Sequence, residues 1–333
     1  MTASPGRPLG DLFPAPRAAR CALAVLLLAA YLPSRAQTPP PPDQVRAAIA
    51  SARLGTGYAQ MINMSATPDL SAASYTVDGL DPTAKIDLLH LPYQAKLATL
   101  SPDTTLDWRI AAGWLQFKQD FPTTLAGQGG SIDSKWSAYS LGAGLLAEYR
   151  LGSGFTLVPA LDAGVARLKN AATYNGAANV FGPIYDGLLF NWDANAWFVT
   201  PSVALEWTTP VEGGTVTVTG HVARSWIGSF DETDPVQHFN EAANIYSVRA
   251  EYVHPTSWRV VERPVDVVGY VGYAGFFGAN RDVFGFTGVA EVGAGVQVPI
   301  AGDKPQSDRV RLSGSYLFGA GVRGWTVGVS LEY

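Results

Sequence analysis

Side chains suited to acid–base chemistry at neutral pH are sparse in this chain of 333 residues. Histidine serves as a general base or metal ligand when serine or carboxylate partners lie nearby. There are four histidines, and they are His90, His221, His238 and His254. Only His238 lies in a predicted long outer loop, near Asp231, Glu232 and Asp234. This loop could bind a divalent cation or place a base near lipopolysaccharide. A solvated acidic loop is the favoured explanation, because loops of this composition are common and ligand spacing is absent, so we predict no catalytic residue, metal site or cofactor.

The elements that would position these residues show alternation with a period of two. The chain ends in a row of apolar side chains separated by Thr326, Gly328, Ser330 and Glu332, and the row comprises Trp325, Val327, Val329, Leu331 and Tyr333. An unbroken apolar row in a strand needs a cover, and lipid covers the outside of a transmembrane barrel. The segment therefore predicts the last strand of an antiparallel β-barrel in a bacterial outer membrane. The five apolar residues are its predicted assembly signal.

The N-terminal segment is consistent with export. Arg17 and Arg20 precede an apolar run that is too short to cross a bilayer, and Ser34-Arg35-Ala36 fits a cleavage site. We predict a signal peptide over residues 1–36, a periplasmic Pro-rich linker with a short helix over 37–53, and the barrel over 54–333. Cys21 is the only cysteine and lies in the signal peptide, so the mature chain would have no thiol.

The composition narrows the class of partner. Residues 1–36 hold four Arg and one Asp, so their removal lowers the net charge from −5 to −8. An acidic chain without a basic cluster does not suit nucleic acid. Hydrophobic residues make up 47% of the chain, yet they are spread by alternation instead of forming a second long apolar run. Outer-membrane lipid and lipopolysaccharide are therefore the expected surroundings.

Twelve extended segments account for the mature chain, an even number as in single-chain bacterial barrels. Their predicted ranges are 54–66, 85–99, 104–118, 134–151, 154–168, 190–208, 214–229, 243–254, 264–278, 284–299, 308–319 and 324–333. Tight turns should alternate with longer outer connections such as 67–84, 119–133, 169–189 and 229–242. Apolar residues on one face of each strand, including Phe284 and Phe286, should meet lipid.

Charged residues fall on the opposite faces, where they would line the lumen. The candidates are Lys96, Arg109, Glu148, Arg150, Glu206, Arg249, Glu251, Glu291, Arg309 and Arg311. A Lys or Arg facing lipid at the midplane costs roughly 2–4 kcal/mol, which favours this segregation. Because both signs are present, acids and bases can pair across strands and partly fill the interior. A selective permeation path is the alternative role for these charges.

The chain resembles a known family of outer-membrane proteins. The features are the signal peptide, the helix-prone leader, the segment Ile86-Asp87-Leu88-Leu89-His90-Leu91-Pro92-Tyr93 entering a long strand, and the twelve-strand ending. Together they resemble the solitary outer-membrane autotransporter-type β-barrels, which look like a translocator domain without a passenger. The resemblance implies a structural or transport role without catalysis, and a helix at 43–53 within or below the barrel.

Two other functions stay open at this stage. One is a small-solute, porin-like channel, and the other is an outer-membrane lipase or protease. For the second, no matching Asp-x-Asp or Asp-x-His pattern or placeable Ser–His pair is present. Expected partners are periplasmic chaperones and the barrel-assembly machinery, and the expected state is a monomer.

Removing Tyr333, or replacing it with a charged residue, should reduce the amount of assembled, heat-modifiable barrel. The physical reason is loss of the aromatic end of the last apolar row. Gel mobility of heated and unheated outer membranes measures the assembled fraction. Unchanged assembly would contradict this role for the last strand.

Overall fold

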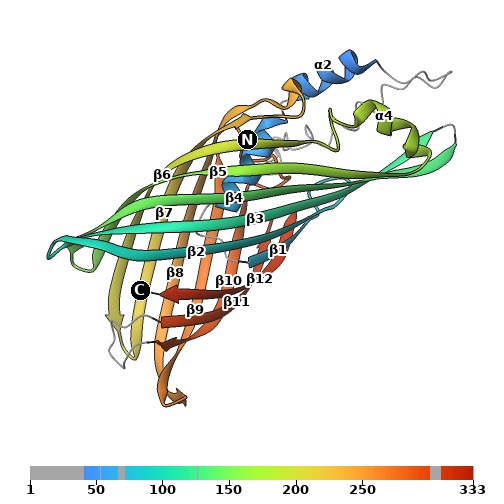
Figure 1. The fold of residues 1–333 in the computed structure, drawn as a ribbon. Coiled ribbons are helices and arrows are strands. Elements are labelled where there is room, and N and C mark those ends of the chain that lie inside the picture. The colour runs from blue at the N-terminus through green and yellow to red at the C-terminus, as the bar shows by residue number, and fades with distance from the viewer. Residues whose placement is uncertain (1–40, 53, 67–71, 126, 301–308, 333) are drawn as a thin grey trace, which may run out of the picture.

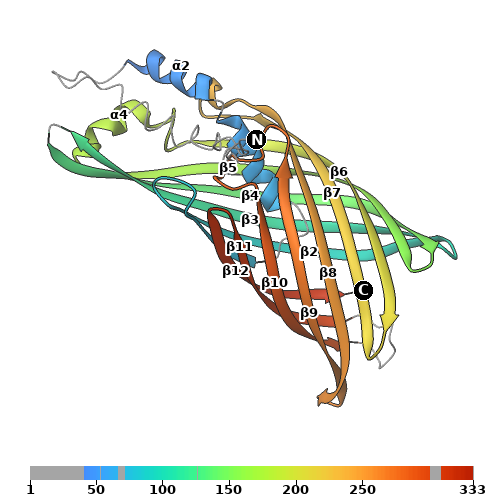
Figure 2. The ribbon, with the colours of Figure 1, turned by 180° about the vertical axis from the view of Figure 1, so that it is seen from behind.

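A computed structural model describes residues 41–52, 54–66, 72–125, 127–300 and 309–332. Twelve strands form a closed antiparallel barrel in which sequence neighbours pair and β1 joins β12 (Figures 1 and 2). The strands are β1 (Ala72–Val77), β2 (Ala84–Ser101), β3 (Thr104–Leu125), β4 (Gln128–Gly152), β5 (Phe155–Gly176), β6 (Asp193–Val211), β7 (Gly214–Phe230), β8 (Asn240–Val260), β9 (Arg263–Phe277), β10 (Gly288–Pro299), β11 (Arg309–Gly319) and β12 (Val322–Glu332). The predicted class and strand number are confirmed.

Apolar side chains cover the outer face, as the alternation predicts. Examples are Leu141 on β4, Leu161 on β5 and Val248 on β8, which are exposed, whereas their neighbours along each strand turn inward. A soluble protein would not leave so many large apolar side chains in water. The exposed rows are therefore the lipid-facing surface of a transmembrane barrel.

The two ends of the barrel differ in their connections. One end has two-residue turns at positions 102–103, 153–154, 212–213 and 261–262. The other end holds the longer connections, including 177–192 with η2 (Ala177–Phe181) and α4 (Gly182–Tyr185), 231–239 with η3 (Pro235–Gln237), and 278–287. We call the second the long-connection end. In outer-membrane barrels the short turns face the periplasm, which assigns the long-connection end to the cell exterior.

The predicted first strand at 54–66 is wrong. Helix α3 (Gly55–Ala66) occupies these residues and contacts β2, β3, β4, β5, β7 and β8, so it lies inside the ring of strands. Residues Tyr58 to Ser65 are buried. A helix satisfies its own backbone hydrogen bonds and can therefore sit inside the barrel without a strand partner. The wall begins instead at β1, six residues long.

Helix α2 (Pro42–Ala52) confirms the helix expected near residue 43, but its position differs from the expected one within or below the barrel. It packs against α4 and η3 at the long-connection end (Figure 1). Val45 and Ile49 lie one turn apart and are 0% and 3% exposed, so this stripe faces the loops. Of the helices in the described ranges, none is long and apolar enough to cross a bilayer.

Other differences concern where strands end. The segment 119–133, expected as a loop, continues β3 and β4 to a two-residue turn, because strands can pair beyond the membrane. Residues 255–263, which separate the predicted strands 243–254 and 264–278, also form mostly paired strand, with the turn at Val261 and Glu262. Phe284 and Phe286 are 5% and 4% exposed. They precede β10 and pack in the core beside Phe117 and Phe276, so their predicted lipid-facing position is wrong.

Gly113 on β3 makes room for α3. A Cβ built there would overlap the Ser65 carbonyl oxygen. Gly113→Ala should therefore lower the free energy of unfolding by about 1–3 kcal/mol, the usual range for overpacking. Denaturant titration in detergent measures the change.

Gly220→Ala is the matched control, because a Cβ at Gly220 meets nothing within 4 Å. Equal stability of both variants would argue against a tightly fitted helix.

Candidate functional site: the barrel lumen

The half of the lumen near the long-connection end is filled by α3, which is hydrogen-bonded to the wall. Ser140 Oγ donates to the Ser65 carbonyl at 3.0 Å, and Ser225 Oγ donates to Asn63 Oδ1 at 2.7 Å. Thr200 lies 2.8 Å from Ser225 and extends this contact to β6. Buried polar groups need such partners in a low-dielectric interior. These bonds fix the depth and rotation of the helix.

Small inward residues create the space that α3 occupies. Ala138, Ala196 and Ala243 come from β4, β6 and β8, are fully buried, and belong to the same apolar cluster as Ile62 and Met64 of the helix. Longer side chains at these positions would meet the helix. The small inward-facing residues of these strands therefore leave space for a helix at this level of the lumen.

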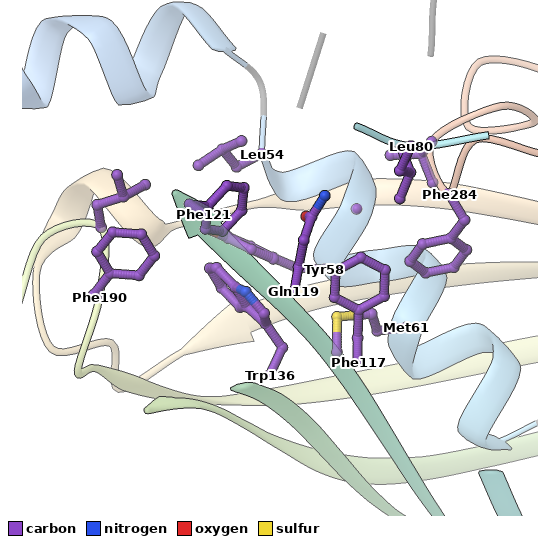
Figure 3. A pocket seen from close by; sticks show the side chains of 13 residues that line it. Leu54, Tyr58, Met61, Leu80, Phe117, Gln119, Phe121, Trp136, Phe190 and Phe284 are labelled. Carbon is purple, nitrogen blue, oxygen red and sulfur yellow. The ribbon is translucent and has the colours of Figure 1, made fainter. Parts of the chain in front are cut away.

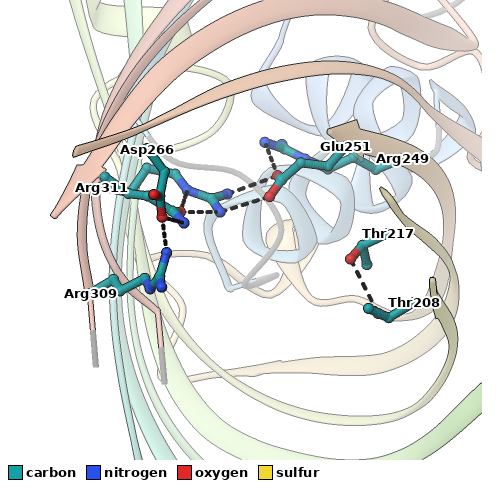
Figure 4. Close-up of polar contacts among 8 residues, drawn as sticks. Thr208, Thr217, Arg249, Glu251, Asp266, Arg309 and Arg311 are labelled. Carbon is teal, nitrogen blue, oxygen red and sulfur yellow. Dashed lines mark hydrogen bonds and ion pairs between the residues drawn. The ribbon is translucent and has the colours of Figure 1, made fainter. Parts of the chain in front are cut away.

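The opposite half of the lumen is dominated by ion pairs on β8, β9, β10 and β11. Arg311 holds Glu251 with two hydrogen bonds of 2.7 and 2.8 Å, and Arg309 pairs with Asp266. Figure 4 shows these side chains inside the curve of the strands. Arg249 lies 3.4 Å from Glu251 and packs over the Tyr270 ring at 3.8 Å. Cation–π contact and carboxylates together compensate the charge of Arg249.

Arg249 also reaches Glu291 on β10, with 3.7 Å between Nη1 and Oε2. Glu291 in turn accepts a 2.6 Å hydrogen bond from Ser315 on β11. A residue that faced lipid could not make these contacts. Arg249 and Glu291 thus belong to the polar interior.

A second ion pair joins two strands on the inner face of the wall, on the other side of the lumen from β8 to β11. Arg109 on β3 binds Asp162 on β5 through two guanidinium nitrogens, and Gly144 of β4 lies between them in the register. A Cβ at Gly144 would collide with the Asp162 carboxylate. The glycine therefore lets the guanidinium lie directly over β4.

The remaining lumen candidates make fewer contacts. Glu148 accepts a hydrogen bond from Thr105, and Glu206 accepts one from Thr208, each at 3.2 Å. Lys96 stands opposite Asp107 in the register but is exposed, as is Arg150. Both lie toward the short-turn end, where solvent compensates their charge.

Beneath α3, the lumen contains a partly open cavity of about 330 Å³. Charged and polar groups on its wall include Arg109, His221, Arg249 and Glu291. The wall carries both signs of charge, so the cavity suits water and small polar solutes better than apolar ones.

On the exterior side, α2 is joined to the β7–β8 loop by an ion pair. Arg46 Nη2 lies 3.0 Å from Asp234 Oδ2, and the Val236 N–H donates to Asp234 Oδ1 at 3.0 Å. Burial alone would raise the pKa of Asp234, but these two donors outweigh it and lower that pKa below its usual value. The carboxylate is therefore ionised at neutral pH, and the contribution of the pair is lost as pH falls through its pKa.

His238 lies in the same loop, with Nδ1 2.8 Å from Glu232 Oε1 and 3.5 Å from Ser229 Oγ. In a serine hydrolase the two ring nitrogens divide these roles, with Nε2 toward the nucleophile. Here both partners face Nδ1, and Ser229 also donates to the Phe239 carbonyl. These contacts hold the β7–β8 loop in place and do not have the arrangement of a catalytic triad.

The predicted assembly signal falls on β12. Trp325, Val327 and Val329 are 57%, 50% and 72% exposed on the outer face, alternating with the buried Thr326. The Leu331 side chain and Tyr333 lie outside the part of the chain that the structure describes.

The residues that hold the helices in place are absent from the predicted sites, and they are chiefly Asn63, Ser65, Arg46 and Gly113. One signal was present, since positions 54–64 alternate poorly. A polar Gln60 and Asn63 three residues apart among Met61, Ile62 and Met64 have helical, not strand, spacing.

The Arg109–Asp162 pair offers a direct test of the lumen electrostatics. Arg109→Met leaves Asp162 without its partner and should lower the free energy of unfolding by about 3–5 kcal/mol. Arg109→Met with Asp162→Leu removes both charges and should recover most of that loss. Denaturant titrations of the two single variants and the double variant complete the cycle; additive losses would show that the pair does not interact.

Three solved barrels are similar in fold. The β domain of the Bordetella autotransporter Brka is 11% identical, with 79% of this chain and 97% of that chain covered and a TM-score of 0.47. The translocator domain of NalP from Neisseria meningitidis is 12% identical, with 86% of this chain and 96% of that chain covered and a TM-score of 0.48, and the transport unit of AIDA-I from Escherichia coli is 9% identical, with 82% and 95% covered and a TM-score of 0.45. No curated protein matches the sequence. The family model for the solitary outer membrane autotransporter β-barrel domain matches residues 70–330. The chain therefore belongs to that family of bacterial outer-membrane barrels.

Proposed function

We propose that this protein is a plugged translocator-type barrel with a structural or transport role and without catalysis. The observation that carries the proposal is α3, held inside the ring of strands by the Ser140–Ser65 and Ser225–Asn63 hydrogen bonds. Helix α2 then leads away at the long-connection end. In this arrangement α2 lies at the cell exterior, and α3 closes the lumen.

The charged lumen supports the structural part of this proposal. Arg309, Arg311 and Arg109 each pair with a carboxylate on another strand. Mutually compensated charges stabilise a narrow interior without any bound solute. Lipid and lipopolysaccharide surround the outer face, and we further propose a monomer assembled by chaperones and the barrel-assembly machinery.

A small-solute channel is the second candidate, favoured by the polar cavity of about 330 Å³ beneath α3. In that case α3 would be a removable gate. An enzyme is less well supported, because the only serine–histidine–glutamate group considered above uses one ring nitrogen for both contacts.

Two deletions separate the roles of the helices. Removal of residues 42–66 from the mature protein should raise single-channel conductance in planar bilayers, because nothing else described here crosses the lumen at that level. Removal of 42–52 alone should leave conductance near the wild-type value, since α3 remains. Equal conductance of all three proteins would contradict the plug, and high wild-type conductance would favour the channel.

A further inference from the structure

An apolar pocket lies above the helix at the long-connection end, separate from the polar cavity below it. Figure 3 shows the side chains that line it. Its volume is about 90 Å³. The walls come from α3, from β3 and β4, and from the connections before β2, β6 and β10. Apart from Gly57 and Gln119, every lining residue has a hydrophobic side chain.

Two aromatic pairs give the pocket rigid walls. Tyr58 and Trp136 stack with ring centroids 5.3 Å apart, and Phe117 and Phe284 stack at 6.0 Å. Gln119 carries the one amide side chain in the lining, and its Nε2 donates one hydrogen bond to the Pro82 carbonyl at 2.7 Å, which holds the amide against the connection before β2. Apolar walls of this kind hold water poorly and favour apolar guests.

The pocket lies where two apolar clusters meet. One cluster contains Tyr58, Met61 and the strand walls, and the other contains α2 and the β5–β6 connection. Leu54 and Trp136 pack against both. Leu54 and Val283 are only partly buried, so solvent at the long-connection end reaches the edge of the pocket.

We propose that this pocket binds a small apolar molecule, of about the size of one aromatic ring and without hydrogen-bonding groups. The guest stacks against the aromatic walls and contacts the flexible Met61 side chain. The volume is too small for a whole long acyl chain, and the predominantly apolar walls disfavour a polar solute. The bound molecule joins α3 to the exterior loops without entering the charged half of the lumen.

The test uses fluorobenzene and the full mature protein in lipid nanodiscs, observed by ¹⁹F NMR. Saturation transfer should reveal a bound population beyond that in empty nanodiscs. Gly57→Leu should weaken binding at least tenfold, because the new side chain enters the pocket. A Cβ at Gly57 meets only Val283, at an ordinary 3.5 Å, so the helix can accept the change.

Gly220→Leu is the matched control, since it adds the same side chain where nothing lies within 4 Å. Binding should equal that of wild type. If Gly57→Leu fails to give heat-modifiable barrel, Val283→Phe fills the pocket from the opposite wall. Absence of a bound population in wild type, or equal binding by the filled variants, would overturn the proposal. Neither result depends on conductance, so the plug is tested separately.

Discussion

Closure of the sheet is the constraint on which the rest of this barrel depends. Hydrocarbon offers no hydrogen bonds, so each strand in the membrane needs a partner on both sides. The closing contact pairs β1 with positions Val322 to Val327 of β12, and β1 has only six residues. It follows a few residues after α3, whose last turn is bound to Ser140. Fixing the helix in the lumen therefore also limits where the closing strand can begin.

The interior is divided by side-chain size. Near the exterior, alanine, serine and glycine face inward, and the space is taken by α3. Toward the short turns, Arg249, Glu251, Arg309 and Arg311 reach across neighbouring strands and fill the space themselves. A single wall thus holds a helix at one level and an ionic network at the other. Hydrogen bonds of Ser65 and Asn63 at the first level, and ion pairs of Arg309 and Arg311 at the second, pair polar groups with the wall.

Much of the wall could be predicted from the sequence, because lipid on one face enforces strict alternation. Trp325, Val327 and Val329 lie outward as the pattern predicts, and Arg109 pairs inside the lumen. Alternation carries no such information for residues that never meet lipid. Residues 54–66 were therefore misassigned as a strand, and Phe284 and Phe286 were placed outside although they pack in the core. Contacts such as Arg46–Asp234 join positions 188 residues apart, and local sequence cannot reveal them.

In the proposed orientation the N-terminal helices pass from the lumen to the cell exterior. The chain has one cysteine, in the predicted signal peptide, so single cysteines can be introduced cleanly. Ala47 lies on the exposed side of α2, and Ser257 lies near a short turn at the opposite end, so Ala47→Cys and Ser257→Cys each place one thiol at a different end of the barrel. Intact cells are treated with a bulky PEG-maleimide that does not cross the outer membrane. We expect labelling at position 47 in intact cells and at position 257 only after lysis. The reverse pattern would show that the helices do not reach the cell exterior.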